Sequence, residues 1–291
     1  MYVPPSVVIR TMMTSRVAFV PARLSALKRN SSAPPIEANI GTGFTRPDGR
    51  GSLKVGSTTD NPQTVNRDGR REMDRARHVY QRLLGHYGPQ HWWPAETAFE
   101  AIVGALLMQQ TSWRNVEVAI RNLRRAGLLD VRALAEAPVP VIRRHVRIAG
   151  LYRTKPARVR AFCRHLLDRC DGDLARYFGR PTDVVRADLL AQDGVGPETA
   201  DSILLYAGGH PVFVVDAYTE RIGTRIGLFR TREYRAIQNF FEQHVPRELA
   251  TYQEYHALLV RHVKTLCRAA NPACAECPVQ SLCDFGRRRK R

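Results

Sequence analysis

Three groups of residues in the chain have types and spacings that could do chemistry. The first is a set of four cysteines near the C-terminus, arranged as Cys267-x6-Cys274-x2-Cys277-x5-Cys283. Four thiolates this close in sequence can surround one metal centre. The residues alone leave open a tetrahedral zinc ion, an iron–sulfur cluster and disulfide bonds. A zinc ribbon pairs two C-x2-C motifs, however, and this stretch holds one.

The second group is a Gly-x-Gly turn between two predicted helices, formed by Gly194 and Gly196 and followed by Glu198 and Thr199. Both glycines can adopt positive φ and allow another backbone to approach closely. Their amides, together with those at the N-terminus of the following helix, can donate to a phosphate. Glu198 in the first helical turn is favoured by the helix dipole, which requires no functional role for it. The turn predicts a phosphate-binding hairpin.

The third group centres on Asp216, which follows the apolar run Val212–Val215 and precedes a predicted helix at Ala217–Ile226. A carboxylate beside a sugar can stabilise developing positive charge and activate water. The same side chain can cap the helix, and the two roles are compatible. Asp216 is therefore the candidate catalytic residue.

Composition limits the class of protein. The 291 residues hold 45 Lys or Arg against 27 Asp or Glu, a net charge of +18 at pH 7. Such a charge predicts a polyanionic partner, most simply nucleic acid, although a basic but inert surface is the alternative. A hydrophobic content of 44% is sufficient for a core. No run of about 18 uncharged apolar residues occurs, which excludes a transmembrane helix.

The elements that must position these groups are helices. Apolar residues recur at helical spacing from residue 71 onward, while Val212–Val215 is the one short run with strand character. We therefore predict an all-α fold. The expected helices are Arg71–His86, Phe99–Met108, Val116–Ala126, Val131–Ala137, Pro140–Ile148, Lys155–Asp168, Asp183–Ala191, Glu198–Ala207, Ala217–Ile226, Arg232–His244 and Tyr252–Thr265.

Together these motifs resemble the helix-hairpin-helix–GPD superfamily of DNA glycosylases. The order of Leu107-Met108-Gln109-Gln110-Thr111, the hairpin with the Gly208–Asp216 loop, and the cysteine spacing is that of the family. The cysteine spacing resembles the [4Fe–4S] loop of the endonuclease III branch, so Cys267, Cys274, Cys277 and Cys283 are expected to hold such a cluster. The resemblance covers about Arg71 to Asp284.

The family implies a two-domain architecture, a six-helix barrel domain and an iron–sulfur helical domain. The expected divisions are a disordered basic arm at 1–70, a first iron–sulfur segment at 71–96, the barrel at 97–209, the cluster domain at 210–284 and a basic tail at 285–291. Organellar targeting by residues 1–36 is a minor alternative for the arm. The enzyme is expected to act as a monomer in the cytoplasm, at the nucleoid, if the source is bacterial.

The resemblance also implies the activity, which is removal of damaged bases from double-stranded DNA in base excision repair. A glycosylase extrudes the nucleotide and cleaves its N-glycosidic bond, with Asp216 as the catalytic carboxylate. Gln110 matches the residue that enters the gap left in the helix, and Tyr218 is a candidate contact to the DNA backbone. The hairpin residues Gly194, Gly196, Glu198 and Thr199 are expected to bind DNA.

Bifunctional relatives carry at the position of Glu198 a lysine that forms a Schiff base. A carboxylate cannot do so. Of the five lysines, Lys155 and Lys264 lie in the predicted core, and neither occupies that position. We therefore expect a monofunctional glycosylase. The alternatives are an endonuclease III-like glycosylase with AP lyase activity on oxidised pyrimidines, and a noncatalytic binder of DNA structure.

Three tryptophans, Trp92, Trp93 and Trp113, resemble the base pocket of the branch whose members remove 3-methyladenine. Alkylated purines are cationic and electron-poor, and aromatic faces attract them by stacking and cation–π interaction. The expected substrates are therefore alkylated purines such as 3-methyladenine. The alternative is that these side chains only pack an interface between domains.

Overall fold

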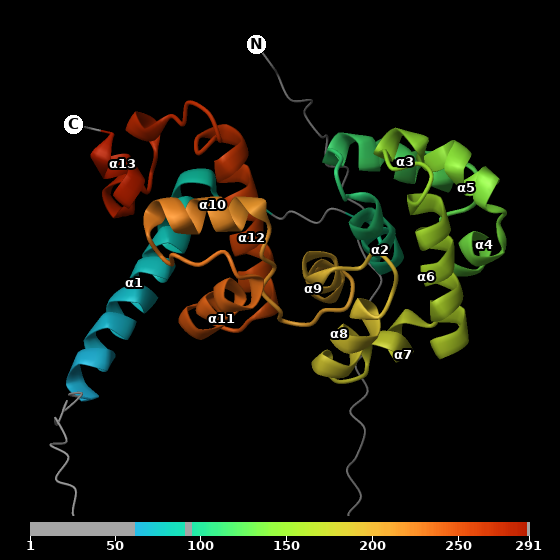
Figure 1. Ribbon diagram of the computed structural model, residues 1–291, viewed down its shortest axis with the longest axis horizontal. Helices are drawn as coiled ribbons and strands as arrows, with labels where there is room; N and C mark the ends of the chain where they lie inside the picture. The colour runs from blue at the N-terminus through green and yellow to red at the C-terminus, as the bar shows by residue number, and fades with distance from the viewer. Residues whose placement is uncertain (1–61, 91–94, 290–291) are drawn as a thin grey trace, which may run out of the picture. The chain divides into compact units, whose positions relative to one another are not determined.

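The computed structural model describes residues 62–90 and 95–289, and for residues 62–74 it describes the backbone alone. Every regular element in these ranges is helical (Figure 1), as the sequence predicts. The first elements are α1 (Pro62–Tyr87), α2 (Ala98–Leu107), α3 (Trp113–Arg125), α4 (Val131–Glu136), α5 (Val139–Val146), η1 (Arg147–Ala149), α6 (Lys155–Cys170) and α7 (Leu174–Phe178). The remaining elements are α8 (Thr182–Leu190), α9 (Pro197–Tyr206), α10 (Ala217–Ile226), α11 (Tyr234–His244), α12 (Leu249–Thr265), η2 (Cys274–Glu276), η3 (Gln280–Leu282) and α13 (Asp284–Arg288).

One local prediction is corrected, and the one run with strand character agrees with the all-α prediction. Helix α1 begins at Pro62, inside the segment 1–70 that was expected to be disordered. Proline fits the first turn of a helix, and the Arg, Glu and Met residues that follow are good helix formers. The run Val212–Val215 is buried and lies in no strand of the described chain. The run connects α9 and α10, and its apolar side chains are buried in the core.

The buried side chains of the described residues form two clusters. The first draws on α2 to α9, and the second draws mainly on α1 and on α10 to α13. Helix α1 lies beside α11 and α12 (Figure 1), while α9 contacts both α2 and α12. The last residues of α9, Leu205 and Tyr206, belong to the second cluster. The described residues belong to one compact unit, and the boundary between two domains stays a prediction.

A fully buried carboxylate joins helices of both clusters. Asp201 in α9 accepts hydrogen bonds from Arg186 in α8 and from the Tyr234 hydroxyl in α11, each at 2.7 Å. Gln238 in α11 donates a third, also at 2.7 Å. A buried charge is tolerated only when its lone pairs are satisfied in this way. The network fixes the hairpin helix against the chain that follows Asp216.

Candidate functional site

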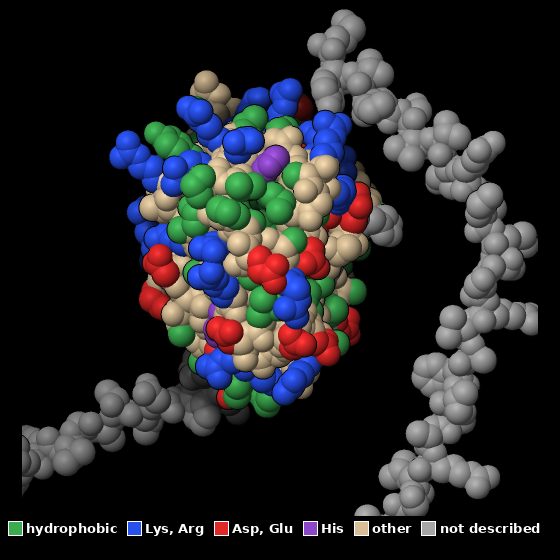
Figure 2. Space-filling view, turned by 90° about the vertical axis from the view of Figure 1, so that its right-hand side faces the viewer, with side chains coloured by type: hydrophobic (Ala, Val, Ile, Leu, Met, Phe, Trp, Pro, Cys, Tyr) green, Lys and Arg blue, Asp and Glu red, His purple; other side chains and the backbone are tan. Residues whose placement is uncertain are grey.

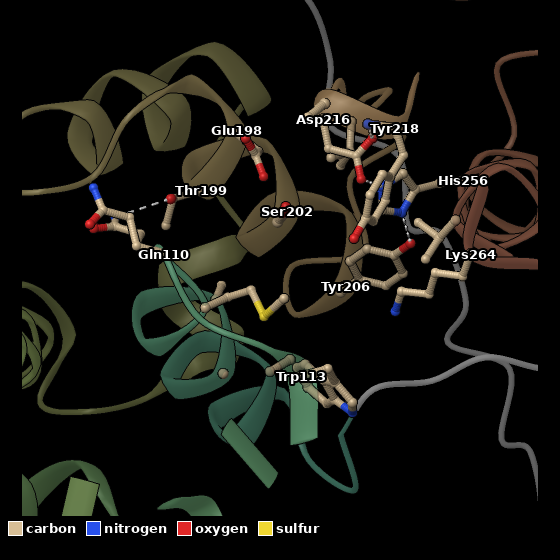
Figure 3. Close-up of a pocket in the computed structure, with 18 residues that line it drawn as sticks. Gln110, Trp113, Glu198, Thr199, Ser202, Tyr206, Asp216, Tyr218, His256 and Lys264 are labelled. Carbon is tan, nitrogen blue, oxygen red and sulfur yellow. Dashed lines mark hydrogen bonds and ion pairs between the residues drawn. The ribbon is translucent and has the colours of Figure 1, made fainter. Parts of the chain in front are cut away.

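The structure brings six of the ten site residues predicted outside the cysteine loop to one cavity of about 500 Å³. Its walls come from the segment between α2 and α3, from α9, from the start of α10 and from α12 (Figure 3). The predicted residues that line it are Gln110, Trp113, Glu198, Thr199, Asp216 and Tyr218. A cavity of this size can enclose a nucleobase.

Asp216 occupies the cavity wall as the N-cap of α10. Its Oδ1 accepts hydrogen bonds from the amides of Tyr218 at 3.0 Å and Thr219 at 2.7 Å, and from the Thr219 hydroxyl at 2.9 Å. Its Oδ2 lies 3.5 Å from Nε2 of His256. One oxygen therefore holds the helix, and the other is oriented by the imidazole.

The two acidic side chains of the cavity have pKa values displaced in opposite directions. Burial of Asp216 disfavours its charge, but the hydrogen bond and charge of His256, with the Thr219 contacts, lower the pKa of its carboxyl below the usual range. Partial loss of water and the nearby charge of Asp216 raise the pKa of Glu198. Asp216 is thus ionised at neutral pH, as a group that stabilises a cation must be.

His256 and Tyr206 were missed in the sequence. The Tyr206 hydroxyl lies 2.6 Å from Nδ1 of His256, which continues the chain of polar contacts away from Asp216. Both residues line the cavity and both are buried. The spacing of residues on α12 is a sequence signal that could have identified part of the cavity wall. His256, Val260 and Lys264 are spaced four apart on α12 and share one helix face.

Of the two hairpin glycines, Gly194 adopts a positive φ and Gly196 does not. Gly194 has φ of 76°, and a Cβ there would meet the Arg158 side chain at 2.5 Å. Gly196 has φ of −89° and acts as the N-cap of α9, so it does not need the left-handed region that was expected. Gln109 donates to the Gly194 carbonyl at 2.5 Å and ties the hairpin to the segment after α2.

Of the three tryptophans expected to form the base pocket, the structure describes Trp113. Trp113 lines the cavity, with its ring against Gly104 and its Nε1 donating to Glu117 at 2.8 Å. Trp92 and Trp93 lie outside the described residues. Tyr206 and Tyr218 add two further aromatic rings to the cavity wall.

Lys264, for which the sequence predicted no role in the site, also lines the cavity. Its amine points into the cavity between Tyr206 and Trp113 (Figure 3). In the described part of the chain it forms no ion pair. The cavity therefore has acidic side chains on one wall and an amine on another.

The four cysteines at 267–283 surround a second, smaller cavity. Among the described residues, none of the four forms a disulfide bond. Arg225 donates to Cys267 Sγ at 3.2 Å, and the Gly286 amide donates to Cys283 Sγ at 3.3 Å. Among the described residues, no three His, Cys, Asp or Glu side chains are grouped closely enough to hold a single metal ion.

One face of the molecule carries many basic side chains. On the side of α3 to α6, which Figure 2 shows, Lys and Arg gather in the upper part, and the lower part mixes Asp and Glu with further Lys and Arg. The basic part would suit a polyanionic partner. No helix of the described residues is both long and apolar enough to cross a bilayer.

Comparison with known proteins agrees with this geometry. The family model for HhH-GPD superfamily base excision DNA repair proteins matches residues 103–247. A Methanocaldococcus jannaschii protein named as a DNA repair glycosylase is 41% identical over 208 residues, 70% of this chain and 94% of its own.

Solved structures give the same fold. A trapped endonuclease III–DNA covalent intermediate aligns with a TM-score of 0.66 at 23% identity, over 75% of this chain and 99% of its own. An H. pylori 3-methyladenine DNA glycosylase bound to 1,N6-ethenoadenine aligns with a TM-score of 0.58 at 27% identity, over 66% and 97%.

An all-helical fold with a hairpin, a capped aspartate and a base-sized cavity defines a base excision DNA glycosylase. The chain belongs to the HhH-GPD superfamily of base excision DNA repair proteins. It is a DNA glycosylase of the endonuclease III-like type.

Proposed function

We propose that the protein is a monofunctional DNA glycosylase that acts as a monomer on damaged double-stranded DNA. The observation that carries this is the arrangement of Asp216 and Glu198 in one cavity. Asp216 is held ionised beside the space where an extruded sugar would lie. It would stabilise positive charge at C1′ and orient the attacking water. Glu198 stands where a bifunctional enzyme needs an amine, so no Schiff base forms there.

The DNA would be held by the hairpin and by side chains at the cavity mouth. The amides around Gly194 and Gly196, and those at the start of α9, can bind a phosphate. Gln110 is exposed and lines the cavity, which suits a residue that fills the gap left by the nucleotide. Tyr218 and Thr199 complete the wall that faces the extruded strand.

The substrate class that we propose is alkylated purines such as 3-methyladenine. Trp113, Tyr206 and Tyr218 supply aromatic surface to the cavity. Stacking on such surfaces favours electron-poor purines, with Trp92 and Trp93 as further candidates for the pocket. The H. pylori relative, with its 3-methyladenine name and its bound ethenoadenine, supports the same class.

The cysteine loop is proposed to hold a [4Fe–4S] cluster on Cys267, Cys274, Cys277 and Cys283. The support is the spacing of the four cysteines and their placement around one small cavity. The N–H donors of Arg225 and Gly286 would stabilise ligand sulfurs. Such a cluster would stabilise the loop, and we assign it no part in base removal.

The test uses end-labelled duplexes containing 3-methyladenine, 7-methylguanine, thymine glycol or uracil. Products are separated with and without alkali after incubation with the enzyme. Strand breaks that appear only after alkali, and only with alkylated purines, would establish the proposed function. Breaks without alkali on thymine glycol would refute it.

A second candidate rests on Lys264. Its amine points into the cavity, so a Schiff base to C1′ could form from α12 and not from the hairpin (Figure 3). The protein would then be a glycosylase with AP lyase activity. Borohydride reduction during turnover would trap a covalent DNA adduct in the wild type and lose it in Lys264→Gln. Absence of the adduct in both proteins supports the monofunctional assignment.

A further inference from the structure

Lys155, the first residue of α6, is a buried cation without an acidic partner in the described part of the chain. It is 1% exposed, and its ammonium donates to the carbonyls of Leu107 at 2.8 Å, Gln109 at 2.5 Å and Ala149 at 2.6 Å. Leu107 ends α2 and Ala149 ends η1, where backbone carbonyls lack helical partners and carry negative potential. Burial lowers the pKa of Lys155 to about 8, which leaves the form with three N–H donors predominant at pH 7.

The carbonyls that Lys155 holds come from two segments with unusual backbone. Gln110, directly after Gln109, has φ of 53°, and Leu151, two residues after Ala149, has φ of 42°. The left-handed region is disfavoured for residues other than glycine. Such conformations persist only where the surrounding structure holds them. The three hydrogen bonds of Lys155 supply that restraint to both segments at once.

Both segments present side chains suited to insertion into DNA. Gln110 is exposed at the cavity. In the second segment Ile148, Leu151 and Tyr152 are 46%, 40% and 43% exposed. Exposed apolar side chains on a loop of a DNA-binding enzyme can enter between bases as wedges. The sequence signals for α6 gave Lys155 no role, because the carbonyls it contacts come from distant parts of the chain.

We propose that Lys155 is a positioning residue that clamps segments 108–112 and 148–154 together, so that Gln110 and Leu151 enter the DNA as one rigid unit. The proposal rests on the proposed function, since it assumes that a nucleotide is extruded. Lys155 itself touches no substrate. Without it the two segments must be ordered separately, which lowers the population of extruded nucleotide. Cleavage of a nucleotide already in the cavity depends on Asp216 and is retained.

The experiment compares wild type, Lys155→Met and Lys155→Gln by fluorescence of 2-aminopurine placed next to a lesion. Lys155→Met is expected to lower the extruded population about tenfold, and with it the rate of single-turnover base release at saturating enzyme, while affinity for undamaged DNA stays nearly unchanged. Lys155→Gln keeps two N–H donors, so its extruded population is expected to lie between those of the wild type and Lys155→Met. If Lys155→Met does not fold, Lys155→Gln replaces it in the comparison. Cys163→Ala, a buried change further along α6, is the control for stability alone.

A folded Lys155→Met protein with the extrusion signal of the wild type would overturn the proposal. So would an equal loss in Cys163→Ala at the same melting temperature. A double-mutant cycle measures the coupling between two wedge residues, and a uniform loss of stability would not change that coupling. Gln110→Ala and Leu151→Ala should be coupled in wild type and independent in Lys155→Met. The 2-aminopurine signal reports extrusion whether or not a base is released. Failure of the proposed function would appear as no base release from any lesion, which is a separate result.

Discussion

Replacing Asp216 by Asn removes a negative charge from the cavity and keeps the shape of the side chain. Oδ1 accepts from Tyr218 N, Thr219 N and Thr219 Oγ1 at 2.7–3.0 Å, and an amide oxygen can accept the same three bonds. The N-cap of α10 is therefore preserved. We expect the free energy of unfolding to fall by less than about 1 kcal/mol, whereas Asp216→Ala should cost about 0.5–2 kcal/mol.

The effect on base release is larger, because it depends on the charge. The Asp216 side chain is 14% exposed, so water screens it only in part. A unit charge about 4 Å from a developing cation contributes about 4 kcal/mol at an effective dielectric constant near 20. Loss of that attraction corresponds to about a 10³-fold decrease in rate. Binding of undamaged DNA should not change, since phosphate contacts are untouched.

Three measurements separate these effects: single-turnover base release, DNA affinity by fluorescence anisotropy, and thermal unfolding. Glu220→Gln is the matched control, because it makes the same chemical change one turn along α10. Glu220 pairs with Arg232 at 3.3 Å and lies outside the cavity lining. Base release by Asp216→Asn within about tenfold of wild type, with normal unfolding, would refute the catalytic assignment.

Three further predictions concern the cavity and its support. The pKa of Glu198 is raised, so the folded state binds the carboxyl proton more tightly than the unfolded state does. The folded protein therefore loses stability as the pH rises from 4.5. Glu198→Gln should therefore raise the melting temperature at pH 7 but not below pH 4.5, and equal gains at both would contradict this. Asp201→Ala leaves Arg186 without its buried partner and should cost about 3–5 kcal/mol in denaturant unfolding, against little for the exposed Asp183→Ala. Lys264→Gln removes a positive charge and should raise release of cationic 7-methylguanine relative to neutral hypoxanthine by about fivefold, and an unchanged ratio would count against a role for Lys264 in selecting bases.

The helices could be predicted from sequence because their signals are local. Thr97 caps α2 by accepting from the Glu100 amide at 3.1 Å, and Asp216 caps α10 in the same way. These caps and the apolar spacing act within one or two turns, so no knowledge of the fold is needed. The start of α1 at Pro62 was missed, because its first turns lack the apolar spacing by which the other helices were assigned.

The partners of the site residues could not be predicted, because they come from distant parts of the chain. His256 reaches Asp216 from α12, and Tyr206 reaches His256 from α9. Lys264 lies three residues before Cys267 in the sequence, and the rotation of α12 turns its side chain into the cavity. That rotation is set by which face of α12 packs against the second core cluster.

The sequence by itself determined the helical class, the hairpin turn, the candidate aspartate and the four cysteines. Each depends on residue types at short spacing, where local geometry decides the outcome. Only the tertiary structure decided which side chains meet. It gave Asp216 an imidazole partner, set the wall position of Lys264 and directed the Lys155 ammonium at three carbonyls. These contacts follow from how the helices pack, because packing fixes the rotation of each helix about its axis.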